Sequence, residues 1–370
     1  MSKTYRVGVI GFAHMHVNHL IDVFDDHPSV EWVACADTVP DIEPRSAKPS
    51  TRRANVTRAQ EKTGIPKVYD DYHTMLDNEA FDIVIFCPEN AKHGEVGEAI
   101  ANHGIHMLTE KPMAASLSGA LRMVRAARAN DVELMVNWPT TWRPSIRAMK
   151  ALIDDGVIGD LWEVKWRNGP SMGPLAYNKG ADILTDAEKG SEWWHHDAPG
   201  GGALLDYCCY GACLSRWYVG EAAQAAVAVK ANMTSHYGDA DDNAVITVRF
   251  PTTLAILEGT WTTYHSGVPT GPIAYGTRGT LVHTRAGVEV YTTRSYELGN
   301  PDRVVEGDPL PEGRTNEAEA FIHHLETGEP LHTTLDPQFN LEAMAILDAG
   351  IRSAASGEME TVDNATWCIG

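Results

Sequence analysis

Residues 5–16 read YRVGVIGFAHMH and decide the fold class, because they join an apolar strand to a helix through a glycine turn. At such a turn, backbone N–H groups of the helix N-terminus can bind the pyrophosphate of a dinucleotide. The spacing is Gly11-x-Ala13-x-x-His16, in which Ala13 still allows close approach of the backbone and His16 replaces the glycine used for tight helix–strand packing. The expected cofactor contacts in the turn are Gly11, Phe12, Ala13, His14 and Met15. A turn of this type that has lost its cofactor is the alternative.

From residue 5 to about residue 140, short apolar runs alternate with segments that have the periodicity of helices. This pattern is typical of βαβ units and a doubly wound parallel sheet. Strands are expected at residues 5–10, 32–36, 83–87, 105–109 and 133–136, and helices at 14–24, around Gln60, at 91–103 and at 117–129. The polar, proline-containing segment 37–57 is expected to be a loop.

Asp37 ends the second expected strand, the position from which a carboxylate bonds a ribose 2′-hydroxyl, and this favours NAD as cofactor. Three arginines in the following loop, Arg45, Arg52 and Arg53, leave NADP open. An ordinary aspartate at a strand end is the alternative interpretation.

The pattern changes after Gly159, where long alternating runs appear at residues 161–167, 225–233, 244–250, 254–263 and 279–282. Such runs predict an α+β domain with a large, open, mainly antiparallel sheet. Helices are expected at 316–325 and 339–355, and whether they pack back on the first domain is left open. The expected domains are residues 1–140, which bind NAD(P), and 141–370, which bind substrate. The free face of the second sheet predicts a homodimer or homotetramer.

Composition restricts the classes of partner. The 370 residues carry a net charge of −20 with scattered Lys and Arg, which argues against binding to nucleic acid or to an anionic membrane surface. The six cysteines show no CxxC spacing and indicate reduced thiols, so a cytoplasmic location is expected. No apolar run reaches membrane-spanning length, and the N-terminus does not resemble a signal peptide.

Two stretches carry candidate chemistry. Glu110-Lys111-Pro112 follows the expected strand at 105–109, and ligands of open α/β sheets bind at the carboxyl ends of the strands. Three glycines, 200–202, lead into an expected helix on which Asp206 and Tyr210 are four residues apart and share one face. A phenol beside a cation can act as a proton acceptor, and Lys111 would supply the cation. A buried tyrosine capped by an aspartate is the alternative.

The chain contains two clusters of histidines and one of cysteines. Two clusters have a spacing that could ligate a metal: His14, His16 and His19, and residues 195–197 (His-His-Asp). Neither cluster has the second pair of ligands of a structural zinc site, so no metal is expected. Cys208, Cys209 and Cys213 are expected to be small buried residues on a helix.

Over essentially its whole length the chain resembles the Gfo/Idh/MocA oxidoreductases. The resemblance rests on residues 9–11, 87–93, 110–114, 156–159, 200–210, 275–279 and 316–321. It implies that Lys111 lies beside the nicotinamide and the substrate hydroxyl, and that Lys111–Pro112 is a candidate for a cis bond. The family motif Asp-x-Gly-x-His ends in a catalytic histidine; here Asp206 is kept, while Cys208 and Tyr210 replace the glycine and the histidine. Relatives similar to glucose–fructose oxidoreductase and dimeric dihydrodiol dehydrogenase carry a tyrosine there and use it.

The resemblance implies an NAD(P)-dependent dehydrogenase acting on a hydroxyl carbon of a sugar, sugar derivative or cyclitol, with hydride passing to the nicotinamide. Tyr210 is expected to take the hydroxyl proton, Lys111 to stabilise the alkoxide, and Asp206 to orient the substrate or the lysine. Further cofactor contacts are expected from Cys87, Pro88, Asn90, His93, Glu110, Lys111 and Asn137.

Substrate contacts are expected from aromatic and charged residues near the strand ends and in the segment 168–199, which could cover the cleft as a lid. They are Trp138, Trp142, Arg143, Tyr177, Trp194, His195 and His196, with Asp206 and Tyr210. For any one of the aromatic residues, packing in the core or the lid is the alternative. Two other functions stay open: a glycosidase that oxidises its sugar transiently and eliminates the aglycone, and a catalytically silent NAD or ligand sensor.

Overall fold

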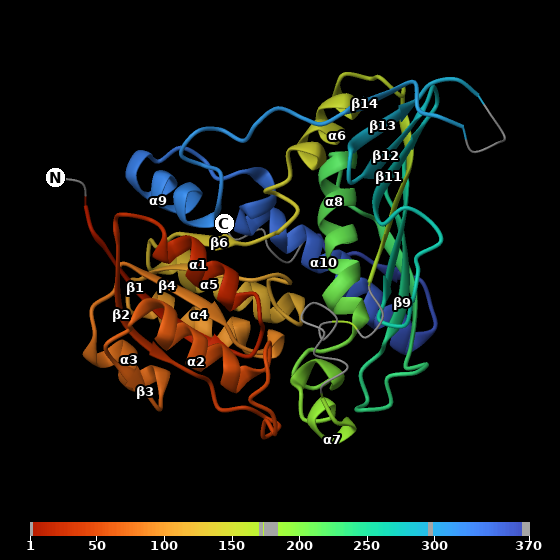
Figure 1. The fold of residues 1–370 in the computed structure, drawn as a ribbon. Coiled ribbons are helices and arrows are strands. Elements are labelled where there is room, and N and C mark those ends of the chain that lie inside the picture. Colours follow the sequence, from red (N-terminus) through yellow and green to blue (C-terminus); the bar gives the residue numbers. More distant parts are fainter. Residues whose placement is uncertain (1–2, 170–172, 174–183, 295–298, 365–370) are drawn as a thin grey trace.

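The computed structural model describes residues 3–169, 173, 184–294 and 299–364, and the chain forms two sheets that lie side by side (Figure 1). The N-terminal part contains a six-stranded sheet and the C-terminal part a nine-stranded sheet. Helices α8 (Cys209–Val219) and α10 (Pro337–Ser356) lie between them.

The N-terminal sheet is parallel throughout, with the order β3-β2-β1-β4-β5-β6. The direction of winding reverses between β1 and β4, as in a Rossmann fold, so the expected doubly wound α/β class is confirmed. The elements are β1 (Tyr5–Phe12), α1 (Val17–Asp25), β2 (Val30–Ala36), α2 (Arg52–Thr63), β3 (Val68–Tyr69), α3 (Tyr72–Asn78), β4 (Ile83–Cys87), α4 (His93–Asn102), β5 (His106–Thr109), α5 (Leu117–Ala129) and β6 (Leu134–Val136).

The expectation of a loop through residue 57 is wrong, because α2 begins at Arg52. The sequence hides this helix because polar residues occupy even its buried positions, which include Arg52 and Asn55, so no apolar periodicity marks it. The short elements β3 and α3 were also not expected. Strand β4, by contrast, is buried at every position, as a strand covered on both faces must be.

The C-terminal sheet has the order β14-β13-β12-β11-β7-β10-β9-β8-β15. All pairs are antiparallel except β7 and β10, which confirms the expected open, mainly antiparallel sheet. Its strands are β7 (Leu161–Asn168), β8 (Ala225–Ala231), β9 (Asn243–Arg249), β10 (Leu254–Thr260), β11 (Gly271–Gly276), β12 (Thr280–Thr284), β13 (Gly287–Tyr291), β14 (Arg303–Val305) and β15 (Glu360–Thr361). The other helices are α6 (Pro144–Asp154), α7 (Asp186–Lys189) and α9 (Glu317–Thr327).

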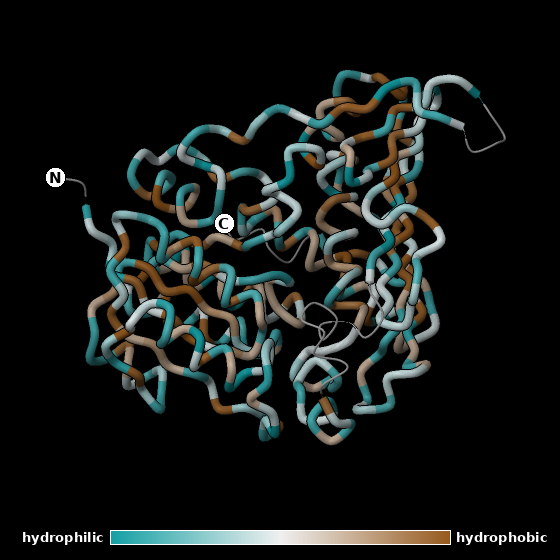
Figure 2. The backbone as a smooth tube through the Cα atoms, viewed as in Figure 1, coloured by the Kyte–Doolittle hydropathy of each residue, from teal (hydrophilic) through white to brown (hydrophobic). Residues whose placement is uncertain are grey.

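One face of this sheet is covered and the other is open. Helix α8 packs on β7 and β10, and α10 packs on β8 and also reaches α5 and β6 of the first sheet. Helix α9 packs on α1, where His19 bonds Glu317. On the opposite face Val229 and Val245 are directly paired and both exposed, and Figure 2 shows that hydrophobic and hydrophilic residues are mixed along the strands of the C-terminal sheet.

Candidate active site

Lys111 lies at the carboxyl end of the parallel sheet, two residues beyond β5, and its peptide bond to Pro112 is cis, as the family resemblance implied. The side chain is 2% exposed, and its Nζ donates to Asp206 Oδ1 at 2.9 Å and to the Asp206 carbonyl at 3.1 Å. Burial alone would lower the pKa of Lys111, but Asp206, and less strongly Tyr210 and Cys209, hold it well above its ordinary value. Lys111 is therefore an ammonium group at any physiological pH.

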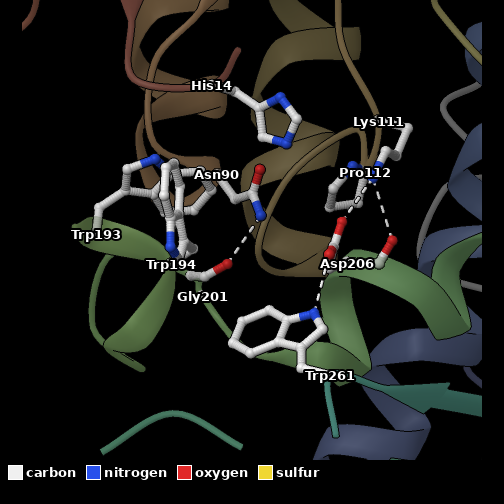
Figure 3. A pocket seen from close by; sticks show the side chains of 11 residues that line it. His14, Asn90, Lys111, Pro112, Trp193, Trp194, Gly201, Asp206 and Trp261 are labelled. Carbon is white, nitrogen blue, oxygen red and sulfur yellow. Dashed lines mark hydrogen bonds and ion pairs between the residues drawn. The ribbon is translucent and has the colours of Figure 1, made fainter. Parts of the chain in front are cut away.

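Asp206 is held from two sides (Figure 3). It lies in a π-helical turn, Leu204–Cys208, that leads directly into α8. While Lys111 bonds Oδ1, the indole Nε1 of Trp261 donates to Oδ2 at 3.1 Å. Trp261 follows β10 and is 1% exposed. In the sequence, Trp261 falls within the expected strand at residues 254–263, and no motif marks it as a site residue.

Tyr210 lies in the first turn of α8, where its ring stacks on Trp166 and meets Trp138 edge-on. Lys111 Nζ lies 4.7 Å from the ring centroid, so the ammonium faces the aromatic ring as well as the carboxylate. The structure thus brings together the three residues proposed as catalytic, with Lys111 between the other two.

Lys111, Asp206 and Trp261 line a small pocket whose walls come from both parts of the chain (Figure 3). The lining residues are His14, Asn90, Lys111, Pro112, Trp193, Trp194, Gly200, Gly201, Gly202, Asp206 and Trp261. A smaller adjoining pocket is lined by His14, Met15, His16, Lys111, Asp206, Tyr207 and Tyr210.

The glycines at 200–202 let the C-terminal part approach the first sheet closely. Gly200 has φ +86°, and a Cβ there would lie 2.7 Å from Ala115 and 2.9 Å from Asn90. Asn90 Nδ2 donates to the Gly200 carbonyl at 2.8 Å. The glycine-led motif therefore joins the two halves of the site as well as starting the helix.

Comparison with protein families agrees with this architecture. Residues 5–138 match the model described as "Oxidoreductase family, NAD-binding Rossmann fold", and residues 146–282 match the Gfo/Idh/MocA C-terminal domain. The chain belongs to the Gfo/Idh/MocA oxidoreductase family.

Named relatives of this family member are dehydrogenases. D-apiose dehydrogenase of Rhizobium rhizogenes is 30% identical over 122 residues, which is 33% of each chain. Myo-inositol 2-dehydrogenase of Thermotoga maritima is 22% identical over 335 residues, 88% of this chain and 89% of that protein. Among solved structures, the WlbA dehydrogenase of Bordetella pertussis, in complex with NADH and UDP-GlcNAcA, has a TM-score of 0.74 at 20% identity and covers 98% of this chain and 99% of its own.

The nucleotide turn of this family member has unusual side chains. Gly11 has φ +82°, and a Cβ there would meet the Pro88 backbone at 2.5 Å, so glycine is required. The Ala13 N–H donates to the Cys87 carbonyl at 3.1 Å, and Trp193 Nε1 donates to the Ala13 carbonyl at 2.9 Å. Trp193 thus lies directly on the turn, and it belongs to the segment 168–199 that the sequence suggested as a cover for the cleft.

Asp37 lies at the end of β2, where the adenosine ribose of a bound NAD would be held. Its Oδ1 accepts from Arg52, Phe12 N and Thr38 N, whereas Oδ2 accepts from Arg52 at 2.7 Å and from no other described residue. Because each carboxylate oxygen can accept about two hydrogen bonds, Oδ2 has room for one ribose hydroxyl. The residue fits NAD.

Arg52 itself does not extend into the crevice as a phosphate ligand. It is 4% exposed, and it also bonds Glu89 Oε1 at 2.6 Å and the Thr38 carbonyl at 2.8 Å. A 2′-phosphate at this place would meet the Asp37 carboxylate while Arg52 is already paired, so the local charge favours NAD over NADP.

Several residues expected to bind the cofactor are buried and bond other protein groups near the site. Glu110 is 1% exposed and accepts from Asn137 Nδ2 at 2.6 Å and pairs with His16 Nδ1 at 3.0 Å. His93 is buried between the carbonyls of Pro88 and Met113, and burial lowers its pKa. Of the residues expected along β4 and its loop, Asn90 alone lines the pocket.

The residues expected to bind substrate are dispersed. Trp194 lines the pocket together with Asp206. Trp138 is buried and its indole donates to Asn340, and the indole of Trp142 donates to Asn137. Arg143 is exposed at the start of α6. His195 packs edge-on against Trp261, and burial lowers its pKa to about 3. His196 bonds the Gly190 carbonyl. Tyr177 lies outside the described residues.

Other site types find little support in the described part of the chain. Over residues 3–169, 184–294 and 299–364, no three His, Cys, Asp or Glu side chains are arranged to ligate a metal. Within the same ranges no helix has the length and apolarity needed to cross a membrane. Cys208, Cys209 and Cys213 are buried, as expected, and lie at and after the π-helical turn.

Proposed function

We propose that the chain is an NAD-dependent dehydrogenase that oxidises a hydroxyl carbon of a neutral sugar, sugar derivative or cyclitol. The observation that carries this proposal is the Lys111 ammonium, held between Asp206 and Tyr210 at the carboxyl end of a Rossmann sheet. Bound NAD would supply the nicotinamide C4 that accepts the hydride leaving the substrate carbon.

Among the described residues, the hydrogen bonds of Lys111 leave one donor for the substrate. An ammonium group has three N–H donors, and Asp206 accepts two of them through Oδ1 and its carbonyl. The third can donate to the substrate hydroxyl oxygen and stabilise the negative charge that develops there. Because the pKa of Lys111 is raised, this residue does not act as the base.

Tyr210 is the proposed acceptor of the hydroxyl proton. It shares the smaller pocket with Lys111 and Asp206, and its ring is fixed by Trp166 and Trp138. Asp206 then acts as the group that positions the ammonium.

A neutral substrate is proposed from the charge of the pocket. Lys111 and Asp206 neutralise each other at 2.9 Å, and the remaining lining consists of amide, imidazole and indole groups. Aromatic walls with a few donors and acceptors suit the alternating apolar and hydroxyl faces of a polyol.

The test is calorimetric titration with NAD and NADP, followed by a panel of polyols and aldoses monitored at the NADH absorbance band. Lys111→Met and Tyr210→Phe are each expected to lower turnover by about 10²–10⁴-fold and to leave NAD affinity within a few-fold. Lys150→Met, which removes a surface lysine paired with Asp154, is the control. Unchanged turnover in both site variants would refute the assignment of roles.

The same panel separates the alternative functions. A glycosidase of the transient-oxidation type would release the aglycone from glycosides without accumulating NADH. A silent sensor would bind NAD or ligand without turnover, and one observation favours it: Arg52 already bonds both oxygens of the Asp37 carboxylate.

We also propose a cytoplasmic homo-oligomer. In support, the face of the C-terminal sheet opposite α8 exposes Val227, Val229 and Val245 on adjacent strands, and such a patch suits burial against a second copy. The five described cysteines are all free and buried, which suits a reducing compartment.

A further inference from the structure

We propose that His14 is a neutral hydrogen-bond donor that binds the substrate hydroxyl oxygen from the side opposite Lys111. The inference rests on the proposed dehydrogenase function and assigns a substrate contact to a residue of the nucleotide turn. His14 follows β1 by two residues and lines both the main pocket and the adjoining smaller one.

The hydrogen bond at Nδ1 fixes the position of the ring proton. The backbone N–H of His16 donates to His14 Nδ1 at 3.1 Å. A ring nitrogen that accepts a hydrogen bond cannot carry a proton, so in the neutral ring the proton is on Nε2. His14 is therefore locked as the Nε2–H tautomer.

The surroundings keep the ring neutral. Burial lowers the pKa of His14 well below its ordinary value, and the neighbouring His16, Lys111 and His93 act in the same direction. His14 is 9% exposed, and the rings of His16 and Trp193 pack beside it at centroid distances of 4.3 and 6.2 Å. A neutral ring that already holds its proton on Nε2 is a donor and not the catalytic base.

The donor points into the pocket. Figure 3 shows one ring nitrogen of His14 directed into the space between Asn90 and Asp206, with Lys111 on the far side. Within the described residues, no protein group bonds Nε2. His14 and Lys111 line the same two pockets, so the site has one neutral donor and one cationic donor.

Two donors that converge on one oxygen stabilise an alkoxide more than a hydroxyl, since the bonds strengthen as negative charge develops. Neither donor can take the hydroxyl proton, which agrees with Tyr210 as the proposed proton acceptor. An alternative role for His14 is to hold the turn through His16 alone, and the experiment must separate the two.

The kinetic test uses His14→Phe, which keeps a ring without a donor, and His14→Gln, which keeps a donor of similar reach. We expect His14→Phe to lower kcat/KM for the best polyol by roughly 10- to 150-fold, the loss for one hydrogen bond to a charged oxygen. His14→Gln should recover most of that loss, and NAD affinity should stay within twofold in both. His19→Phe, on the exposed side of α1, is the control.

The second test does not depend on turnover. Nitrogen-15 spectra of histidine-labelled protein, with His14 assigned by its loss in His14→Phe, should show a neutral Nε2–H ring between pH 6 and 8. Saturation with NAD and myo-inositol, D-xylose or D-glucose should shift Nε2 and leave Nδ1 unchanged. A cationic ring, an Nδ1–H tautomer, or no shift with every probe would overturn the proposal. If the ring behaves as stated but no polyol reduces NAD, the dehydrogenase function fails while the ligand contact of His14 stands.

Discussion

Replacing Trp261 by phenylalanine tests whether the carboxylate of Asp206 must be held from both sides. The substitution keeps an aromatic ring in a site that is 1% exposed and removes the Nε1–H that donates to Asp206 Oδ2 at 3.1 Å. Lys111 would still bond Oδ1, but the carboxylate would be free to rotate about its Cβ–Cγ bond. The ammonium would then lose its fixed position beneath the substrate oxygen.

The size of the effect follows from the type of bond removed. A hydrogen bond to a charged group contributes about 1.5–3 kcal/mol, which corresponds to roughly 10- to 150-fold in rate. The Asp206 side chain is 16% exposed, so water can replace part of the lost bond. We therefore expect the lower half of that range, a loss of about 10- to 40-fold in kcat/KM.

The assay is steady-state NADH formation with the best polyol at 25 °C, together with calorimetric NAD affinity and a circular dichroism check of the folded state. Trp32→Phe is the matched control, because its indole also donates to a carboxylate, Asp25, at 3.0 Å but lies on β2. If Trp261→Phe keeps kcat/KM within twofold of the wild type while the control behaves alike, Trp261 does not position Asp206.

Three further results are expected. Burial raises the pKa of Glu192 from 4.5 to about 8, so the folded state binds a proton that the unfolded state releases. The free energy of unfolding should therefore fall as pH rises from about 4.5 through 8, by at most about 4 kcal/mol at pH 8. Thermal melts of Glu192→Gln should lack this loss. Arg52→Met leaves Asp37 and the buried network without its guanidinium and should cost about 3–5 kcal/mol in denaturant unfolding, whereas a loss below 1 kcal/mol would contradict the inferred pairing. Val229→Asp, on a side chain 71% exposed opposite Val245, should dissociate the oligomer in sedimentation velocity, and an unchanged profile would place the interface elsewhere.

The fold was predictable because its signals are local. Strand β4 is apolar at each position and α5 has the apolar spacing of a helix, so each element could be recognised from its own residues. The elements that escaped were short or polar. Helix α2 buries Arg52 and Asn55, and their burial depends on partners elsewhere in the chain that no periodicity reveals.

The site was predictable only in part, for a related reason. Lys111 and Asp206 could be paired because each belongs to a recognisable stretch, and the structure places them 2.9 Å apart. Trp261 belongs to no such stretch. It reaches Asp206 because β10 pairs with β7 in the middle of the C-terminal sheet, and that strand order cannot be read from β10 itself.

The side chains that depart from the nucleotide-turn motif contact the residues around Lys111. In the sequence, His16 in place of glycine suggested a weakened cofactor site. In the structure its ring pairs with Glu110 at 3.0 Å, and its backbone N–H fixes the ring of His14. Glu110 in turn bonds the backbone N–H of Lys111 at 3.2 Å. The side chains that replace the usual small residues therefore connect the turn to the lysine, so a substitution at His16 should disturb the reaction centre as well as the cofactor turn.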